Sequence, residues 1–233
     1  MQEISDGLAE AATLVLSGDP ALVEIILLSL QVSGSAVVIA CLLGLPLGAL
    51  LAVARFPGRG AVIVTCNALM GLPPVVVGLT LYLLLSRAGP LGPLGLLYTP
   101  EAMVLAQAVL VTPIVAALSR QVLSGMAEEY DETLRAMGAS KLAIALTLLR
   151  DARFALITVA LAGFGRAIAE VGAVLIVGGN INHATRVMTT AIALETSRGN
   201  LALALGLGLV LILLALSVNA AVMALGQREA AHA

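Results

Sequence analysis

AEEYDETLRAMGASKLAIALTLLRDAR, residues 127–153, is a charged island in an otherwise apolar chain. It holds five of the fourteen acidic residues and the only lysine, Lys141. Over all 233 residues, 60% are hydrophobic, 11% are charged and the mean hydropathy is +1.07, whereas about a quarter of the residues in a soluble domain are charged. We therefore expect an integral membrane protein whose island meets something outside the membrane.

The island has the pattern of two short helices separated by a glycine. In the first, from residue 127 to Met137, apolar residues recur at helical spacing and acids crowd the first turn. Gly138 stands where a helix would stop, and Ser140 can cap the next one. The pattern fits a docking site for a partner, and equally a solvated linker between two spans.

The rest of the chain predicts an all-α membrane protein in one domain, residues 1–233, with about five spans. Asp19-Pro20 and Thr99-Pro100 are both typical helix starts, with a capping side chain followed by proline. The expected spans are residues 21–54, 60–86, 100–120, 154–178 and 201–225.

The second span is interrupted at Leu72-Pro73-Pro74. Prolines free backbone carbonyls, which membranes tolerate where the segment faces protein or a watery cavity. Pro73 and Pro74 therefore indicate either a segment beside the transport path or a simple packing kink.

The fourth span carries Arg166 and Glu170, followed by Gly172. At i and i+4 they would share one face of one helix. A charge near the bilayer centre costs about 2.5 to 3.5 kcal/mol, so these side chains are expected to face a partner or a water path. Two interpretations remain open: mutual neutralisation, or an anion path in which Arg166 supplies positive potential and Glu170 holds the helix.

Basic residues set the orientation. If the island is cytoplasmic, eight of the twelve cations lie on the cytoplasmic side, as the positive-inside rule requires. The N-terminus is then outside and the C-terminus is cytoplasmic. The eight are Arg55, Arg59, Arg120, Arg135, Lys141, Arg150, Arg153 and Arg228.

No catalytic constellation is found in the sequence. There is no GxxxxGK[ST] motif, so we expect ATP to be hydrolysed by another chain. His183 and His232 are isolated, and Cys41 and Cys66 lie in apolar runs, which argues against a metal site. The polar stretch that follows the fourth span and runs to Asn200, including residues 182–186 and 189–190, fits a contact for a solute-binding protein or an ordinary exposed loop.

Residues 132–140, ETLRAMGAS, resemble the EAA motif of permease subunits of ATP-binding-cassette importers, with Thr and Leu in place of the two alanines. The resemblance implies a type I importer (MetI-like) fold and a coupling helix seated on a cytoplasmic ATPase. Glu132 would contact the ATPase, and Gly138 would allow the turn. The residues implied in coupling are Tyr130, Glu132, Arg135, Gly138 and Ala139.

Residues 165–173, GRAIAEVGA, with GGNI at 178–181, resemble the oxyanion branch of these permeases, and Leu72-Pro73-Pro74 fits that branch. The run TAIALET at 190–196 is most similar to tungstate permeases, with molybdate and sulfate as alternatives. The resemblance implies path or gate roles for Arg166, Glu170, Gly172, Pro73 and Pro74.

The resemblance also implies a set of partners. These are a second copy of the chain, two ATPase subunits that bind ATP and Mg, and an extracytoplasmic oxyanion-binding protein, at a bacterial or archaeal plasma membrane. The alternatives from other classes are an ion-coupled secondary transporter, with Arg166 and Glu170 as a charge relay, and a membrane-embedded enzyme, for which the chain offers no catalytic residues.

Overall fold

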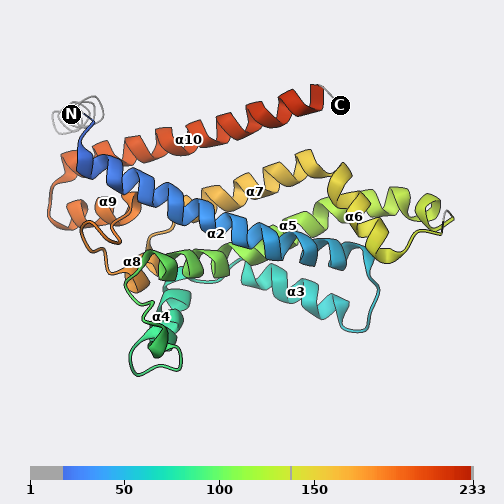
Figure 1. The fold of residues 1–233 in the computed structure, drawn as a ribbon, viewed down its shortest axis with the longest axis horizontal. Helices are drawn as coiled ribbons and strands as arrows, with labels where there is room; N and C mark the ends of the chain where they lie inside the picture. Colours follow the sequence, from blue (N-terminus) through green and yellow to red (C-terminus); the bar gives the residue numbers. More distant parts are fainter. Residues whose placement is uncertain (1–17, 137, 232–233) are drawn as a thin grey trace. The chain divides into compact units, whose positions relative to one another are not determined.

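The structure is a computed structural model that describes residues 18–136 and 138–231, and this part of the chain is helical without strands (Figure 1). The side chains of residues 129, 131–136 and 225–231 lie outside the description. The helices are α2 (Pro20–Val53), α3 (Arg59–Leu69), α4 (Pro74–Leu85), η1 (Gly92–Leu94, a 3-10 turn), α5 (Pro100–Ala136), α6 (Lys141–Asp151), α7 (Arg153–Ile168), α8 (Gly172–Gly178), α9 (Met188–Ser197) and α10 (Leu201–Ala231).

Among the described residues, three helices are long and apolar enough to cross a membrane, namely α2, α5 and α10. Two bent pairs raise the number of candidate spans to as many as five. Helices α3 and α4 meet at 99°, and α7 and α8 meet at 59°. The all-helical prediction is therefore confirmed, and the second and fourth predicted spans are each broken in the middle.

Helix starts and stops follow the sequence signals. The Leu22 N–H donates to Asp19 Oδ1 at 2.9 Å, and the Ala143 N–H donates to Ser140 Oγ at 3.2 Å. Gly138 and Gly179 adopt positive φ values of 74° and 71°, which glycine reaches without steric cost. The predicted starts at Asp19 and Ser140 and the predicted stop at Gly138 are therefore confirmed, and Gly179 ends α8 in the same way.

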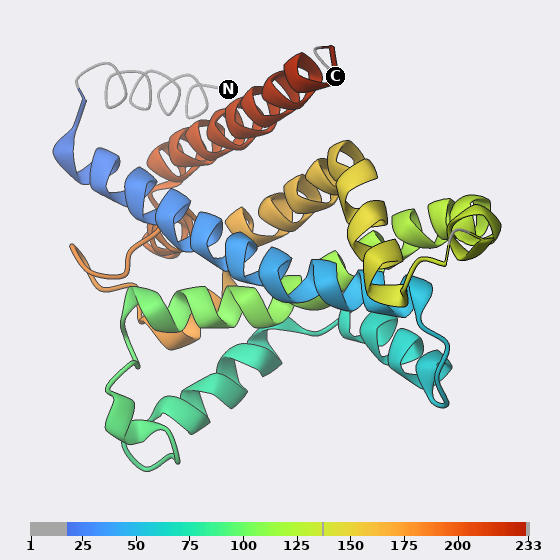
Figure 2. The same ribbon diagram turned by 45° about the vertical axis from the view of Figure 1, so that its right-hand side comes forward.

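The prediction of a separate first island helix is wrong. Helix α5 continues without interruption to Ala136, so the third span and the first half of the island are one helix of 37 residues. No proline lies between Arg120 and residue 127. The one glycine there, Gly125, has open space around it and lowers helix stability by only about 1 kcal/mol relative to alanine, so the helix continues. The chain turns at Gly138, and α6 then leads into α7 at a corner (Figure 2).

The loop expected to run to Asn200 is also partly helical, since α9 occupies Met188–Ser197. This helix was not predicted because two polar residues, Thr189 and Thr190, follow its first residue and are typical of a loop. Thr189 and Thr190 are buried, so the prediction that these two residues belong to an exposed outer loop is wrong.

The described chain falls into two compact units. The first combines Pro73–Gln107 and Gly165–Asn219 with the described part of Met1–Ala36. There, Ser29 Oγ accepts a hydrogen bond from the Met188 N–H at 2.9 Å, beside a small core that includes Leu22 and Leu207. This unit holds the residues of the Arg166 site.

The second unit combines Val37–Leu72 and Ala108–Phe164 with the described part of Ala220–Ala233. Its helices approach closely at Gly44 and Gly48. A Cβ at Gly44 would lie 2.9 Å from Val115 Cβ, and one at Gly48 would lie 2.9 Å from the Ala116 carbonyl oxygen. Glycine therefore permits this contact between α2 and α5, and the unit carries the predicted coupling segment.

Candidate functional site

Arg166 and Glu170 lie on either side of the break in the fourth span. Arg166 is in the last turn of α7, which ends at Ile168, and Glu170 precedes α8. The prediction that they share one face of one helix is therefore wrong, although their pairing is not lost. Arg166 Nη1 lies 2.5 Å from Glu170 Oε2, so the ion pair joins the end of α7 to the start of α8.

Both carboxylate oxygens of Glu170 have partners. Oε2 receives the Arg166 guanidinium, and Oε1 accepts a hydrogen bond at 3.1 Å from the Ala173 N–H in the first turn of α8. The side chain is only 3% exposed. One oxygen is held by a cation and the other by a helix amide, so the Glu170 side chain is fixed in place.

Arg166 is different, because its side chain is 32% exposed. Guanidinium has five N–H donors, and one nitrogen is used on Glu170. Arg166 can therefore meet a solute while staying anchored, whereas Glu170 cannot.

Two further residues donate hydrogen bonds to carbonyls at the break: Gln107, which the sequence analysis did not single out, and Thr189, which it assigned to an exposed loop. Gln107 Nε2 on α5 donates at 3.0 Å to the carbonyl of Ala167, a carbonyl near the end of α7. Thr189 Oγ1 on α9 donates at 2.8 Å to the carbonyl of Glu170. The available signal was a lone amide, Gln107, inside an apolar span, since polar side chains at membrane depth mark such sites.

Helix α4, which begins at the proline pair, packs on α8. Pro73 precedes the first turn of α4 and Pro74 is its first residue, the position where proline lacks no needed N–H. A Cβ at Gly172 would lie 3.0 Å from Val75 Cγ2, and one at Gly78 would lie 2.8 Å from Ala173 Cα. The prolines and Gly172 are thus brought together with Glu170 at the start of α8.

The predicted coupling residues lie around the turn between α5 and α6, in the second unit. Tyr130 is half-buried in α5, Gly138 is exposed in the turn with its positive φ, and Ala139 follows it. Glu132 and Arg135 lie in the last two turns of α5, and their side chains, like the whole of Met137, fall outside the described residues. The helix-turn-helix shape of the segment is therefore present, and its contacts to a partner stay predictions.

The segment between α8 and α9 is a braced turn. Arg186 Nη1 donates to Asn182 Oδ1 at 2.9 Å and Arg186 Nε donates to Asn180 Oδ1 at 3.3 Å. His183 Nδ1 lies 2.7 Å from Glu24 Oε2, where the exposed imidazole and carboxylate meet. No three His, Cys, Asp or Glu side chains gather in the described part of the chain in a way that suits a metal ion.

The described helices that are long and apolar enough to cross a membrane, with two further bent pairs, indicate a multi-pass membrane protein. Residues 44–230 match the family described as binding-protein-dependent transport system inner membrane component. The match covers more than half of the chain, so the chain belongs to this family. It is a multi-pass, non-catalytic permease subunit of an ATP-binding-cassette system at the inner membrane.

Three relatives show the same assignment in more detail. The chain is 43% identical over 185 residues to the probable anion ABC transporter permease protein of Haloferax volcanii, with 77% of this chain and 80% of the relative covered. It is 40% identical over 225 residues to the tungstate uptake system permease protein TupB of Peptoclostridium acidaminophilum, with 97% and 99% covered. It is also 40% identical to the protein of that name from Campylobacter jejuni, with 85% and 83% covered.

Membership confirms the predicted class and two of its partners. A binding-protein-dependent system of this kind works with an ATPase and with a solute-binding protein, so this chain has both as partners.

Proposed function

We propose that this chain is the translocation subunit of an importer for a tetrahedral oxyanion, and that the oxyanion is tungstate. Molybdate and sulfate are the alternatives within the same class. The proposal is supported by the relatives, since two that are 40% identical are tungstate uptake permeases and one that is 43% identical is a probable anion permease.

The observation that carries the proposal is that Arg166 is paired with Glu170 and yet partly exposed. A cation held at membrane depth, anchored by Glu170 and still partly accessible, suits the passage of a dianion, since fixed positive charge lowers the energy of an anion in a low-dielectric path. Both carboxylate oxygens of Glu170 are engaged, so it would not repel the solute as a free carboxylate would.

The break beside Arg166 gives the pair a second role. Helices α7 and α8 are joined by three residues, and the ion pair, Gln107 and Thr189 hold that joint. Such a joint suits a gate that changes angle while its charges stay neutralised. We propose that Pro73, Pro74 and Gly172, at the contact of α4 with α8, belong to the same gate.

Energy would enter at the turn around Gly138. We propose that two ATPase subunits, which bind ATP and Mg, each receive one copy of this turn, with Tyr130, Glu132, Arg135 and Ala139 at the contact. The permease would then be a homodimer around one path. ATP-driven closure of the ATPases would move α5 and α6, both of which begin or end at the turn.

The proposed orientation places this turn in the cytoplasm, the N-terminus outside and the C-terminus inside. It rests on eight of the twelve basic residues lying on the cytoplasmic side in this arrangement.

Affinity purification of the tagged chain from its own membranes in mild detergent, with mass spectrometry of the bound proteins, tests the coupling part of the proposal. The expected result is a P-loop ATPase that is lost when Glu132 and Gly138 are replaced together. Recovery of the folded chain without an ATPase in several detergents would contradict it.

A further inference from the structure

The second unit carries an apolar groove whose lining includes none of the residues assigned above to the Arg166 site or to the turn at Gly138. Helix α2 contributes one face with Val37, Cys41 and Leu45, and α7 faces it with Leu156 and Ala160. Together with neighbouring residues they line an open hollow of about 650 Å³. We propose that this α2–α7 groove binds an anionic phospholipid, with an acyl chain along the groove and the phosphate at Arg153.

The length of the groove suits one acyl chain in one leaflet. Its α2 face runs from Val37 to Pro46, nine residue steps or about 13 Å at the rise of an α-helix. One leaflet of a bilayer core is about 15 Å thick. The groove thus extends over nearly the whole depth of a leaflet, and its lining is apolar except at one end.

That end carries Arg153, the first residue of α7. Its side chain is exposed, and its Cζ lies 4.7 Å from the centre of the Phe154 ring. Within the described part of the chain, no carboxylate lies within ion-pair distance of it. Stacking on a ring uses the face of the guanidinium, so its N–H groups at the edge stay available for a phosphate.

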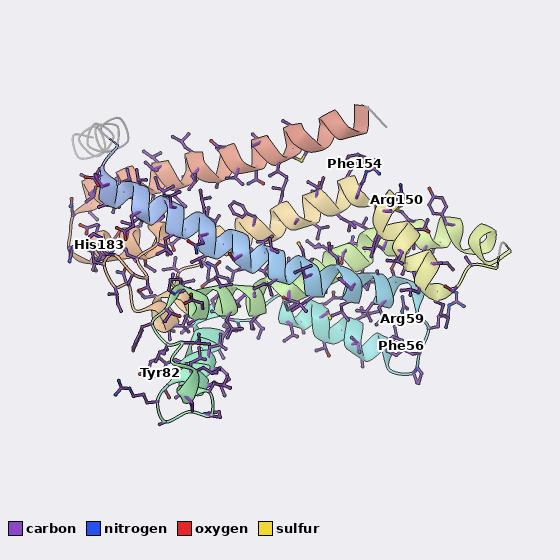
Figure 3. All side chains as sticks on the ribbon, viewed as in Figure 1. Phe56, Arg59, Tyr82, Arg150, Phe154 and His183 are labelled. Carbon is purple, nitrogen blue, oxygen red and sulfur yellow. The ribbon has the colours of Figure 1, made fainter. Side chains whose placement is uncertain are left out.

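The surroundings of Arg153 are those of a headgroup site. Figure 3 shows Arg150 and Phe154 at the corner where α6 meets α7, so a second cation lies at the same corner. Cations at the ends of membrane helices attract anionic headgroups, and basic pockets between such helices bind them specifically.

A phospholipid matches both parts of the groove, because its acyl chain is apolar like the lining and its phosphate is an anion that can reach Arg153 at the end. A second copy of the chain would have to supply an apolar helix and a carboxylate in the same register. Leu42 and Val38 on the rim of the groove are 69% and 59% exposed, as residues that face lipid would be.

The chain has no tryptophan, so one introduced residue reports on its own lipid neighbours. Leu42→Trp places the reporter in the groove, and Leu213→Trp, at a residue that is 63% exposed on α10, is the matched control. The full chain is reconstituted in phosphatidylcholine vesicles containing increasing phosphatidylglycerol, with bromine on the acyl chains of either lipid. Quenching gives the relative affinity for the two lipids at each reporter.

We expect the groove reporter to prefer phosphatidylglycerol by about fivefold, the contribution of one cation near a membrane surface, and the α10 reporter to show no preference. Arg153→Gln should abolish the preference, and Arg153→Lys should keep it. Equal quenching by both lipids at the groove, or a preference that survives Arg153→Gln, would overturn the proposal. Absence of quenching by either lipid would also overturn it and would indicate a protein in the groove.

Discussion

The carboxylate of Glu170 lies 2.5 Å from the guanidinium of Arg166, although α7 ends between them at Ile168. The pair therefore links two helices that meet at 59°, and the two residues do not lie on one face of a single helix. Its two members differ in access, 32% exposed for Arg166 and 3% for Glu170. This asymmetry separates the anchoring residue from the one that can meet a solute.

Replacing Glu170 by Gln should abolish most oxyanion uptake. The amide is nearly isosteric but leaves Arg166 without its counter-ion and weakens the joint between α7 and α8. The measurement is uptake in cells that depend on the variant chain, with recovery of the ATPase as the check on assembly. Uptake equal to that of the parent chain, with normal expression, would remove the gate role.

The matched control is Glu195→Gln, which removes an ion pair at 2.9 Å with Arg198 away from the break. The Arg198 side chain is 59% exposed and Glu195 is 15% exposed, and a pair that reaches solvent in this way contributes at most about 1 kcal/mol, so this variant should transport normally.

Removing both charges tests whether the pair serves only to neutralise itself. If neutralisation is its whole purpose, Arg166→Gln combined with Glu170→Gln should restore uptake, because no uncompensated charge remains. We expect the double variant to stay as inactive as Glu170→Gln alone, since the path would have lost its cation. The measurement is uptake by the single and the double variant at equal amounts of folded protein. Restored uptake in the double variant would show that the pair serves only to neutralise itself.

Gln107→Leu should lower the stability of the chain and slow transport. Leucine has a similar size and suits the membrane, but it removes one of the two hydrogen bonds to the Ala167 carbonyl, which then keeps only the Glu170 N–H at 3.1 Å, a loss of about 0.5–1.5 kcal/mol. Thermal unfolding in detergent measures the effect. The control is Gln121→Leu, which replaces an exposed amide on the same helix and should leave the midpoint of thermal unfolding unchanged. An equal fall of the midpoint in both variants would refute a specific role for Gln107.

Gly78→Ala should separate α4 from α8. The new Cβ would lie 2.8 Å from the Ala173 Cα, which forces the helices to shift at a cost of about 1–3 kcal/mol. The same change at Gly34, a helical glycine of the same unit with open space around it, should be neutral or slightly stabilising. The thermal midpoints and uptake rates of the two variants are compared, and a tolerant Gly78 would show that the contact is not tight.

Gly138→Ala should weaken the hold on the ATPase. A residue with a Cβ pays about 1–2 kcal/mol at a φ of 74°, equivalent to roughly tenfold in affinity if the turn must keep its shape. Titration of the purified ATPase onto the reconstituted permease measures it. Gly125→Ala, inside α5 with nothing near, is the control, and equal affinities for the two variants would argue against a coupling role for the turn.

Local chemistry explains which features could be predicted from the sequence. Asp19, Ser140 and Gly138 act on backbone groups within a few residues, so their caps and turns are visible in the sequence itself. The pairing of Arg166 with Glu170 was visible too, because charged residues at membrane depth must find partners.

The break between α7 and α8 could not be predicted in the same way. No proline marks it, and the side chains that donate to carbonyls at the break, Gln107 and Thr189, lie 60 and 19 residues away from their acceptors in the chain. The unbroken course of α5 through Gly125 was missed for another reason: the third predicted span ended at residue 120, and a separate helix was expected to begin with the charged residues at 127.

Reconstitution with purified partners tests the central claim most directly. Vesicles holding this chain with its ATPase, and with the oxyanion-binding protein outside, are supplied with tungstate, and the tungsten inside is measured by mass spectrometry. The account predicts uptake that requires ATP and the binding protein, stops with Glu170→Gln, and exceeds uptake of sulfate at equal concentration. Uptake that follows a proton or sodium gradient and needs no nucleotide, or sulfate uptake in preference to tungstate, would contradict it.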